Sequence, residues 1–273
     1  VAKHLKEAGA NVTLTTVLGN DKLKNFVLKE FKKNKIKINA IIDNTRPTTN
    51  KNTIIANGYK LLKVDKVDNQ PISDKIFESI KSSLQKENCD LVIFSDFRHG
   101  IFNKTNIKIL SNSIKKNVIK VADSQVASRW GNIVDFKKFD LITPNEKEVR
   151  FSLADQDSSI SELTRELSKL SGFKNLILKL GERGTVTVSK QNNSLSFATP
   201  SFAKNVIDAV GAGDALLAYA SLCLASNNSI VSANILGSIA AACECEMEGN
   251  ISVKRNMIID KINDLEKSSK FNI

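Results

Sequence analysis

The stretch DLVIFSDFRHGIFNKTNIKILSNSIKKNVIKVA, residues 90–122, decides the fold class. Asp90–Ser95 is a short apolar run typical of a buried strand, Lys104–Lys115 repeats apolar residues at helical spacing, and Val118–Ala122 is a second apolar run. A strand, a helix and a strand in this order favour two parallel strands joined by a crossover helix.

The same alternation continues on both sides of this stretch. Two helices near the C-terminus carry so little polar interruption that they should pack in the interior or against the sheet. The series predicts an α/β fold: a mainly parallel sheet with helices on both faces and ligands at the carboxyl ends of the strands. The expected helices are Ser73–Glu87, Ser158–Ser171, Ala212–Ala225 and Ile230–Met247, and the further strands are Asp140–Thr143 and Asn175–Leu180.

The first third of the chain adds two features to this alternation. VAKHLKEAGA, residues 1–10, is typical of the last turns of a helix closed by Gly9, and Asn11–Gly19 alternates like a half-buried strand. Because the chain opens inside a helix, we expect a single domain over 1–273 that is truncated at its N-terminus. Residues 46–66 hold two strand-like runs around Asn57-Gly58, a pair that favours a tight turn, and are expected to form a β-hairpin lid.

Composition excludes several classes of function. The chain has 273 residues, 41% of them hydrophobic, which is enough for the core of a globular domain. Its apolar runs are shorter than the roughly 20 residues of a membrane helix, so we expect no membrane partner. The net charge is +11, but the lysines are spread along the chain without an aromatic-interleaved basic stripe, so we expect no nucleic-acid partner. The four cysteines form no CxxC pair, which is typical of reduced thiols in a cytoplasmic enzyme.

The strongest signal for chemistry is NVIDAVGAGDALLA, residues 205–218. Its small residues Gly211, Ala212 and Gly213 let backbone N–H groups close on an anion at the start of an apolar helix, and Asp214 places a carboxylate beside them. That combination suits phosphoryl transfer, in which a hydroxyl proton leaves while charge on phosphate is stabilised. A plain turn with Asp214 as a helix-start residue is the alternative. A dinucleotide site lacks its third glycine here, and no GK[ST] of a Walker loop is present.

The segment D208-A-V-G-A-G-D214 resembles the D-T-x-G-A-G-D signature of the ribokinase-like (PfkB-type) carbohydrate kinases, with Ala209 where the usual form has Thr. The resemblance covers nearly the whole chain. It implies a ribokinase-like fold, a catalytic base at Asp214, an anion hole formed by Gly211, Ala212 and Gly213, and a nucleotide contact at Asp208.

A second segment, TPNEKE at residues 143–148, follows a predicted strand and is similar to the family's N-x-x-E element. The resemblance implies that Asn145 and Glu148 organise Mg²⁺ and its water around the phosphates. On physical grounds alone, the same residues also suit a helix start, because an acidic side chain there complements the helix dipole.

Two further segments resemble the nucleotide side of the family. LKLGERGTVTV, residues 178–188, places glycines between two strands, and IAAACECEMEGN, residues 239–250, is a small-residue helix that ends in Gly. The glycines also suit plain turns, and Ala-rich helices commonly pack in cores. By resemblance, contacts to the phosphates or ribose fall on Lys179, Gly181 and Gly184, and contacts to the adenine fall on Ser238, Gly249 and Asn250.

The sugar side resembles one branch of the family, the heptose 7-phosphate kinases. Residues 46–65 are similar to that branch's R-P-T…K…R…Q…R-x-D stretch, and SDFRHG, residues 95–100, is similar to its D-Y-x-K-G. Thr53, Tyr59, Lys63 and His99 depart from the pattern. Asp123 ends a strand beside the expected pocket, and Arg129 is either a phosphate contact or a surface residue. The implied substrate residues are Arg46, Lys51, Lys63, Asp96, His99, Gly100 and Asp123.

These features predict an ATP- and Mg²⁺-dependent kinase that phosphorylates a sugar phosphate, at the anomeric hydroxyl of a heptose 7-phosphate by resemblance. The alternatives are another PfkB-type sugar kinase and a non-catalytic nucleotide-binding module of a fusion protein. The expected partners are the small-molecule sugar phosphate, a second copy in a homodimer formed through the lid, and a fused nucleotidyltransferase domain.

Overall fold

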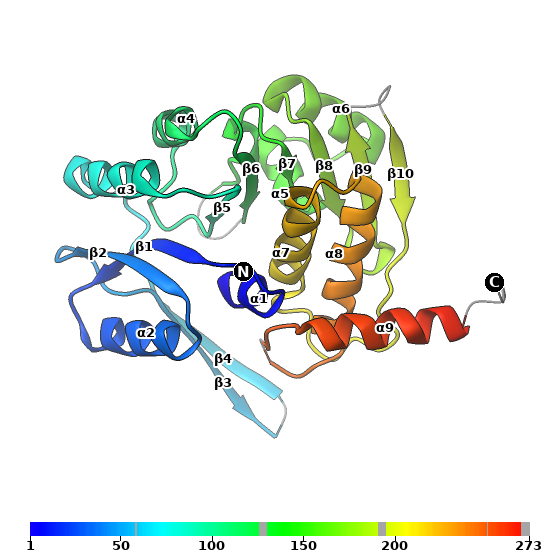
Figure 1. The fold of residues 1–273 in the computed structure, drawn as a ribbon, viewed down its shortest axis with the longest axis horizontal. Helices are drawn as coiled ribbons and strands as arrows, with labels where there is room; N and C mark the ends of the chain where they lie inside the picture. Colours follow the sequence, from blue (N-terminus) through cyan, green and yellow to red (C-terminus); the bar gives the residue numbers. More distant parts are fainter. Residues whose placement is uncertain (58, 126–129, 191–194, 250, 269–273) are drawn as a thin grey trace.

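The computed structural model describes residues 1–57, 59–125, 130–190, 195–249 and 251–268. Its main sheet has six strands in the order β10-β9-β8-β7-β6-β5 (Figure 1). Strands β5 to β8 are parallel, whereas β9 runs antiparallel to both β8 and β10. The predicted mainly parallel α/β fold is therefore confirmed. The strands are β5 Leu91–Asp96, β6 Ile119–Ser124, β7 Leu141–Ile142, β8 Asn175–Lys179, β9 Thr185–Ser189 and β10 Ser196–Thr199.

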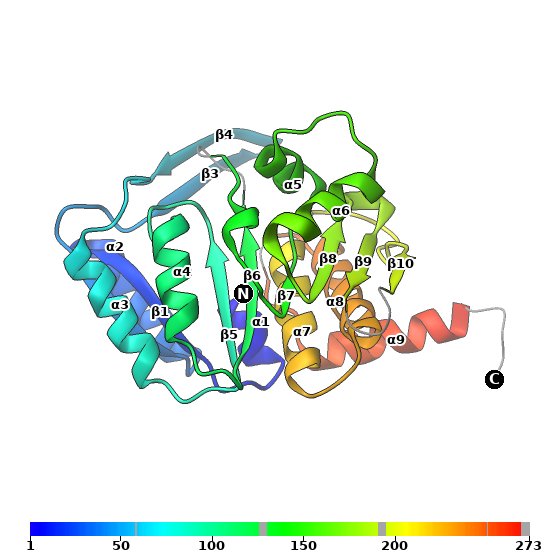
Figure 2. The same ribbon diagram turned by 90° about the horizontal axis from the view of Figure 1, so that it is seen from above.

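Helices cover both faces of this sheet (Figure 2). Consecutive strand residues point to opposite faces, so Val121 and Leu141 join one apolar cluster while Ala122 and Ile142 join another. Strands buried on both faces explain the near-continuous apolar runs in the sequence. One face is packed by α3 Asp74–Lys86, α4 Lys104–Ser113, α5 Glu146–Leu153 and α6 Ile160–Ser171, and the other by α7 Ala212–Ala225 and α8 Ile230–Cys245.

A second, two-stranded parallel sheet forms from β1 Thr13–Gly19 and β2 Lys37–Asp43, joined by α2 Lys22–Lys33. Within the described residues, no strand pairing joins this sheet to the six-stranded one. At the start of the chain, α1 Ala2–Glu7 packs its Leu5 against α7 and α8, together with α9 Arg255–Ser268. Strand β1 was expected from the sequence, whereas α2, β2 and α9 were not.

The predicted hairpin is confirmed as β3 Asn50–Ala56 paired antiparallel with β4 Tyr59–Lys66. It projects from the body of the molecule (Figure 1). Asn57 has φ 50°, as a tight turn requires, and Gly58 lies outside the described residues. Ile54, Ile55 and Leu62 are among the apolar side chains that the hairpin leaves exposed.

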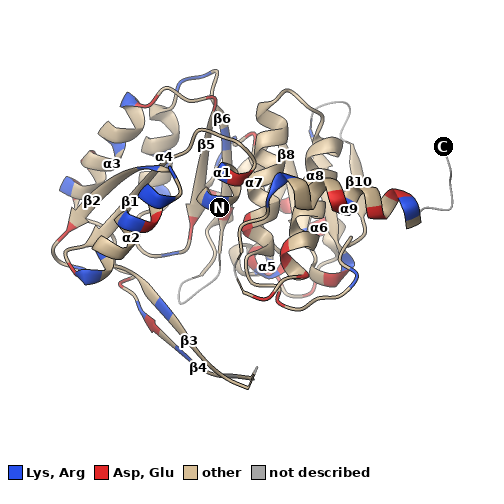
Figure 3. Cartoon of the chain, turned by 60° about the horizontal axis from the view of Figure 1, so that its bottom comes forward, with Lys and Arg blue, Asp and Glu red and all other residues tan. Residues whose placement is uncertain are grey.

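Lys and Arg lie on many elements and are interspersed with Asp and Glu (Figure 3). This distribution agrees with the sequence-based expectation of solvated charged faces rather than one basic stripe. Among the helices of the described chain, none is both long enough and apolar enough to cross a membrane.

Candidate active site

Asp214 lies in the first turn of α7, immediately after the glycine-rich turn. Gly211 is the N-cap residue of α7 and has φ 98°, a conformation that favours glycine. Its carbonyl accepts the N–H of Ala215 at 2.9 Å, which starts the helix. The first N–H groups of a helix have no partners within it, so the turn presents donors and the positive end of the helix dipole beside the Asp214 carboxylate.

The loop before this turn is anchored to the end of α8. The N–H groups of Ile207 and Asp208 both donate to the carbonyl of Cys245, at 2.7 and 3.1 Å. The Asp208 side chain accepts the N–H of Val210 at 3.2 Å. Hydrogen bonds therefore anchor the backbone of the segment that leads into the glycine-rich turn.

A buried ion pair lies next to the glycine-rich turn. Nζ of Lys179, at the end of β8, donates to Oδ1 of Asp123, in β6, at 3.0 Å. The two strands flank β7, which ends at Ile142, and Oγ1 of Thr143 donates to the same oxygen of Asp123 at 3.1 Å. A Cβ atom added to Gly213 would lie 3.2 Å from Nζ of Lys179. The short central strand thus lets Asp123 and Lys179 meet beside the turn.

Asn145 and Glu148 begin α5 and cap each other. Oδ1 of Asn145 accepts the N–H of Glu148 at 2.8 Å, and Oε2 of Glu148 accepts the N–H of Asn145 at 2.6 Å. Burial raises the pKa of Glu148 to about 7, with the charge of Asp123 acting in the same direction and that of Lys179 against it. The structure therefore confirms the prediction that these two residues begin a helix. A metal role is compatible with this, because a carboxylate oxygen that accepts one hydrogen bond retains lone pairs.

The charges at this site influence one another. Burial by itself lowers the pKa of Lys179, but the carboxylates of Asp123, Glu148 and Asp214 outweigh it and raise that pKa. Burial raises the pKa of Asp123, and the Lys179 ammonium opposes this. Three carboxylates and the Lys179 ammonium are thus gathered at the carboxyl ends of the strands, where the sequence predicted a ligand site, and the backbone ammonium of Val1 lies 3.5 Å from Oδ2 of Asp214.

On the sugar side, Arg46 makes several hydrogen bonds within the protein. Its Nε pairs with Oδ2 of Asp43 at 2.9 Å, and its other nitrogens donate to the carbonyls of His99, Gln70 and Pro71 at 3.2–3.3 Å. Gly100 has φ 88°, and a Cβ there would lie 1.9 Å from the carbonyl oxygen of Gln70. Both residues hold the loops at the base of the hairpin together.

Asp96 ends β5 and is also occupied. It accepts hydrogen bonds from the N–H and Nη1 of Arg98, at 2.7 and 3.0 Å, and from Nδ2 of Asn132 at 3.1 Å. The backbone carbonyl of Trp130 binds Nε of Arg98 at 3.0 Å. The expected sugar contact at Asp96 is therefore part of a buried network that fixes Arg98.

The base of the hairpin touches the loop after β5. His99 Nδ1 lies 3.5 Å from Oγ1 of Thr49, and Nζ of Lys51 lies 6.0 Å from the centre of the Phe97 ring. Burial, and then the Lys51 charge, lower the pKa of His99. Lys63, on β4, is 61% exposed and 4.0 Å from Asp65.

The expected nucleotide residues lie in turns and on α8. Gly184 has φ 82°, and a Cβ there would meet the carbonyl oxygen of Thr199 at 2.1 Å, whereas a Cβ on Gly181 or Gly249 would meet nothing within 4 Å. Ser238 is buried and lies 3.5 Å from Oδ1 of Asn234. Asn250 and Arg129 lie outside the described residues.

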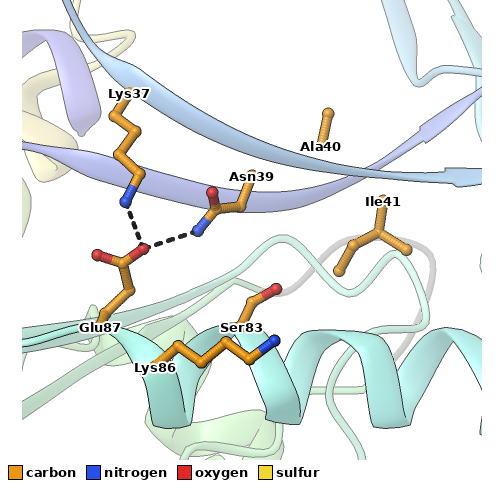
Figure 4. Close-up of a pocket in the computed structure, with 7 residues that line it drawn as sticks. All are labelled: Lys37, Asn39, Ala40, Ile41, Ser83, Lys86 and Glu87. Atoms are coloured by element: carbon orange, nitrogen blue, oxygen red, sulfur yellow. Dashed lines mark hydrogen bonds and ion pairs between the residues drawn. The ribbon is translucent and has the colours of Figure 1, made fainter.

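A cavity of about 440 Å³ lies away from these groups, between β2 and α3 (Figure 4). Glu87 accepts hydrogen bonds there from Nζ of Lys37 at 2.7 Å and from Nδ2 of Asn39 at 3.1 Å. None of the residues predicted to bind ligands lines it.

Sequence reasoning missed three residues that the structure makes prominent. Thr143 was quoted only as part of a motif, although it bonds to Asp123. Arg98 was given no role, although its place inside the SDFRHG motif was a usable signal. Glu244 is fully buried in α8, and among the described residues neither of its carboxylate oxygens makes a well-formed hydrogen bond. The sequence signal for Glu244 was a single Glu within a helix of mostly small and apolar residues.

Comparison with known proteins places this geometry in a family. The family model described as pfkB family carbohydrate kinase matches residues 1–256. The chain belongs to this family. It is therefore a phosphotransferase that acts on a sugar hydroxyl, and its fold is ribokinase-like.

Relatives of this pfkB chain include the "bifunctional protein HldE" of Sulfurimonas denitrificans, 27% identical over 98% of this chain and 56% of that protein. The protein of the same name from Campylobacter jejuni is 30% identical over 93% of this chain and 53% of that protein. The chain thus spans about half the length of these curated relatives.

Two solved structures confirm the fold. Phosphofructokinase-2 from Escherichia coli in complex with potassium has a TM-score of 0.80 at 15% identity, covering 97% of this chain and 85% of that one. Ribokinase from Thermotoga maritima has a TM-score of 0.75 at 20% identity, covering 96% and 84%. At these identities the likeness concerns the fold alone.

Proposed function

We propose that this chain transfers the γ-phosphoryl group of ATP to the anomeric hydroxyl of a heptose 7-phosphate, with Asp214 as the general base. The observation that carries the proposal is the placement of the Asp214 carboxylate at the N-terminus of α7, directly after Gly211–Gly213 and beside the Lys179 ammonium. Proton acceptor, backbone donors and cation thereby lie together, as phosphoryl transfer requires.

The residues present fit an ATP polyphosphate. The absence of a side chain at Gly213 lets the Lys179 ammonium approach the backbone of the turn, because a Cβ there would lie 3.2 Å from Nζ, so a phosphate bound at the turn would meet both N–H donors and a cation. We assign contacts to the phosphates to Gly211, Ala212, Gly213 and Lys179. Asp208, Gly181, Gly184, Ser238, Gly249 and Asn250 remain the proposed contacts for the rest of the nucleotide.

The acidic residues fit Mg²⁺ held mainly through water and phosphate. Within the described residues, no group of three or more His, Cys, Asp or Glu side chains forms a cation cage. Mg²⁺ at phosphate sites commonly keeps several waters and uses one or two carboxylates. We assign that task to Glu148 and Asn145. The metal would supply neutralisation of charge on the phosphates.

The chemistry proposed for the side chains is a direct transfer. Asp214 accepts the proton of the sugar hydroxyl while that oxygen bonds to the γ-phosphorus and the bond from phosphorus to the leaving ADP oxygen breaks. The N–H groups of the turn stabilise the charge that develops on the transferred group. In well-oriented systems, positioning of the two reactants contributes about 7–11 kcal/mol.

The choice of a heptose 7-phosphate rests on the resemblance of residues 46–65 and 95–100 and on the names of the curated relatives. Another sugar or sugar phosphate is the second candidate, because Lys63 is exposed and His99 faces Thr49 where the pattern has other residues. The proposed sugar contacts are Lys51, Lys63 and His99. Arg46, Asp96 and Gly100 hold the loops beside them, whereas Asp123 holds Lys179.

The deciding experiment measures ADP release by the intact protein with heptose 7-phosphate, fructose 6-phosphate and ribose at saturating Mg·ATP. We expect release to depend on heptose 7-phosphate. Preference for another sugar would select the second candidate. ATP binding without release on any sugar would support the third reading, a non-catalytic nucleotide-binding module.

We further propose that residues 1–273 form one kinase domain, which is joined to a nucleotidyltransferase domain and dimerises through the hairpin. The relatives' name "bifunctional" and the half-length match support the fusion. The exposed Ile54, Ile55 and Leu62 support the dimer, since exposed apolar strands invite pairing. Light scattering on the Ile55→Lys variant tests it: a dimer unaffected by the change excludes this interface.

A further inference from the structure

The sequence placed Asp123 on the sugar side, and in the structure one of its carboxylate oxygens is bound by two side chains of the protein. Asp123 is 4% exposed, and its Oδ1 accepts hydrogen bonds from both Lys179 and Thr143. The Lys179 side chain is 15% exposed and lies against Gly213. Asp123 therefore reaches the site through Lys179, and Lys179 borders the turn that precedes Asp214.

On the basis of the proposed function, we propose that Lys179 is a catalytic cation that offsets charge on the transferred phosphoryl group, and that Asp123 is the positioning residue that holds its ammonium against Gly213. The two are contributed by β8 and β6, and both side chains come from the ends of these strands. Rigid strand ends fix an ammonium better than a surface loop does.

The charge balance of the site supports this role. Asp123, Glu148 and Asp214 lie close enough to Lys179 to influence it electrostatically. Without the ammonium these three carboxylates would repel a polyphosphate, since like charges in a partly buried site interact strongly. One fixed cation at this position reduces that repulsion where the phosphate must approach.

A purely structural pair is the competing explanation, and it makes different predictions. A buried ion pair adds little net stability compared with an apolar pair of the same shape, although breaking only one partner is harmful. A structural pair would therefore affect folding when one partner is removed and would show no preference between bound nucleotide states.

The first test compares Lys179→Met with Lys174→Met. Lys174 precedes the same strand and pairs with Asp140 at 2.6 Å, but it is 54% exposed, so it is a matched control. Calorimetry would measure affinity for ADP alone and for ADP with aluminium fluoride, which mimics the transferred group. We expect Lys179→Met to weaken binding of the aluminium fluoride complex roughly 10²-fold more than that of ADP, as loss of a transition-state donor does. Equal weakening of both, or no weakening, would overturn the role.

The second test is a double-mutant cycle with Asp123→Asn. If Asp123 acts only through Lys179, Asp123→Asn lowers kcat by roughly 10–10²-fold with sugar KM unchanged, and adding it to Lys179→Met causes no further loss. If Asp123 contacts the sugar independently, the two losses multiply and sugar KM rises, which would contradict its positioning role. If Lys179→Met fails to fold, the double variant, which removes both buried charges, is compared with Asp123→Asn in the same calorimetric assay. A further selective loss of affinity for the aluminium fluoride complex supports the catalytic role of Lys179. The absence of a further loss refutes that role.

The proposed function and this inference fail in different ways. A wild-type protein that releases no ADP with any sugar phosphate contradicts the function, and the calorimetric comparison still tests Lys179. A wild-type protein that turns over at the same rate as Lys179→Met contradicts only the inference.

Discussion

Asn145 and Glu148 each accept the backbone N–H of the other, at 2.8 and 2.6 Å. A carboxylate proposed to serve Mg²⁺ therefore also starts α5. The two tasks use different properties of one side chain, because capping requires an acceptor oxygen and metal support requires negative charge. Substitutions that change one property at a time can separate them.

Glu148→Gln keeps an acceptor oxygen and loses the charge. We expect thermal stability to stay within about 1 kcal/mol of wild type, because Gln also completes a capping box, while the Mg²⁺ concentration for half-maximal rate rises several-fold. Glu148→Ala should lose both properties. Titration of Mg²⁺ at saturating sugar, beside melting curves, measures the two effects. An unchanged Mg²⁺ dependence in Glu148→Gln would reduce Glu148 to a capping residue.

Asp214→Asn tests the base. The amide preserves shape but accepts no proton, so we expect kcat to fall by roughly 10²–10⁴-fold with little change in ATP affinity. The measurement is ADP release and ATP binding by the intact protein. Retention of most of the wild-type rate would assign the proton to another acceptor.

Glu244 predicts a pH dependence of stability. Burial raises the pKa of Glu244 to about 7, so the folded protein keeps its proton at pH values where the unfolded chain has released it. The contribution of Glu244 to the free energy of unfolding is therefore largest below the ordinary pKa of a Glu and is lost as the pH rises towards and through 7. We expect Glu244→Gln to be more stable than wild type at pH 8, by on the order of 2 kcal/mol, and to match it at pH 4.5.

Thermal melts across this pH range measure the effect, and Glu78→Gln, at an exposed position of α3, is the control. A difference between Glu244→Gln and wild type that does not vary with pH would show that the buried carboxyl is not the source.

Gly100→Ala and Gly181→Ala separate steric necessity from backbone preference. Both glycines have positive φ, but only at Gly100 would a Cβ meet a backbone oxygen, at 1.9 Å. We expect a loss of about 3 kcal/mol or more at Gly100 and only about 1 kcal/mol at Gly181. Denaturant unfolding of both variants checks this. Equal losses would mean that φ alone sets the effect.

Local patterns predicted much of the fold. The apolar runs that became β6 and β8 and the apolar helices α7 and α8 were recognisable because most of their residues are buried. The run of β5 was recognisable by its apolar residues although most of them are only partly buried. The pair formed by α2 and β2 was missed. In α2 the apolar Leu23, Phe26 and Val27 stand at helical spacing among lysines, so a signal existed.

The site was predictable as a set of motifs and not as a set of contacts. Gly211–Gly213, Asp214, Asn145 and Glu148 carry a local pattern. The partnership of Asp123 with Lys179 depends on strand order and on β7 ending early, and neither property is encoded near these residues. A sequence likewise does not show that Arg46, a predicted sugar contact, donates hydrogen bonds to the carbonyls of His99 and Gln70.

The backbone N–H of Lys179 donates to the carbonyl of Pro144 at 2.9 Å, and Asn145 bridges to Lys179. A displacement of one strand end therefore carries the other with it, so Lys179 and Asn145, both assigned to the donor side, form one donor block. Lys51 and Lys63 belong instead to a separate two-stranded projection. With Lys51 and Lys63 as the proposed sugar contacts, exchange of hairpin residues would change the choice of acceptor while the donor block stays unchanged. Grafting another hairpin is then the route to re-engineer which sugar is phosphorylated.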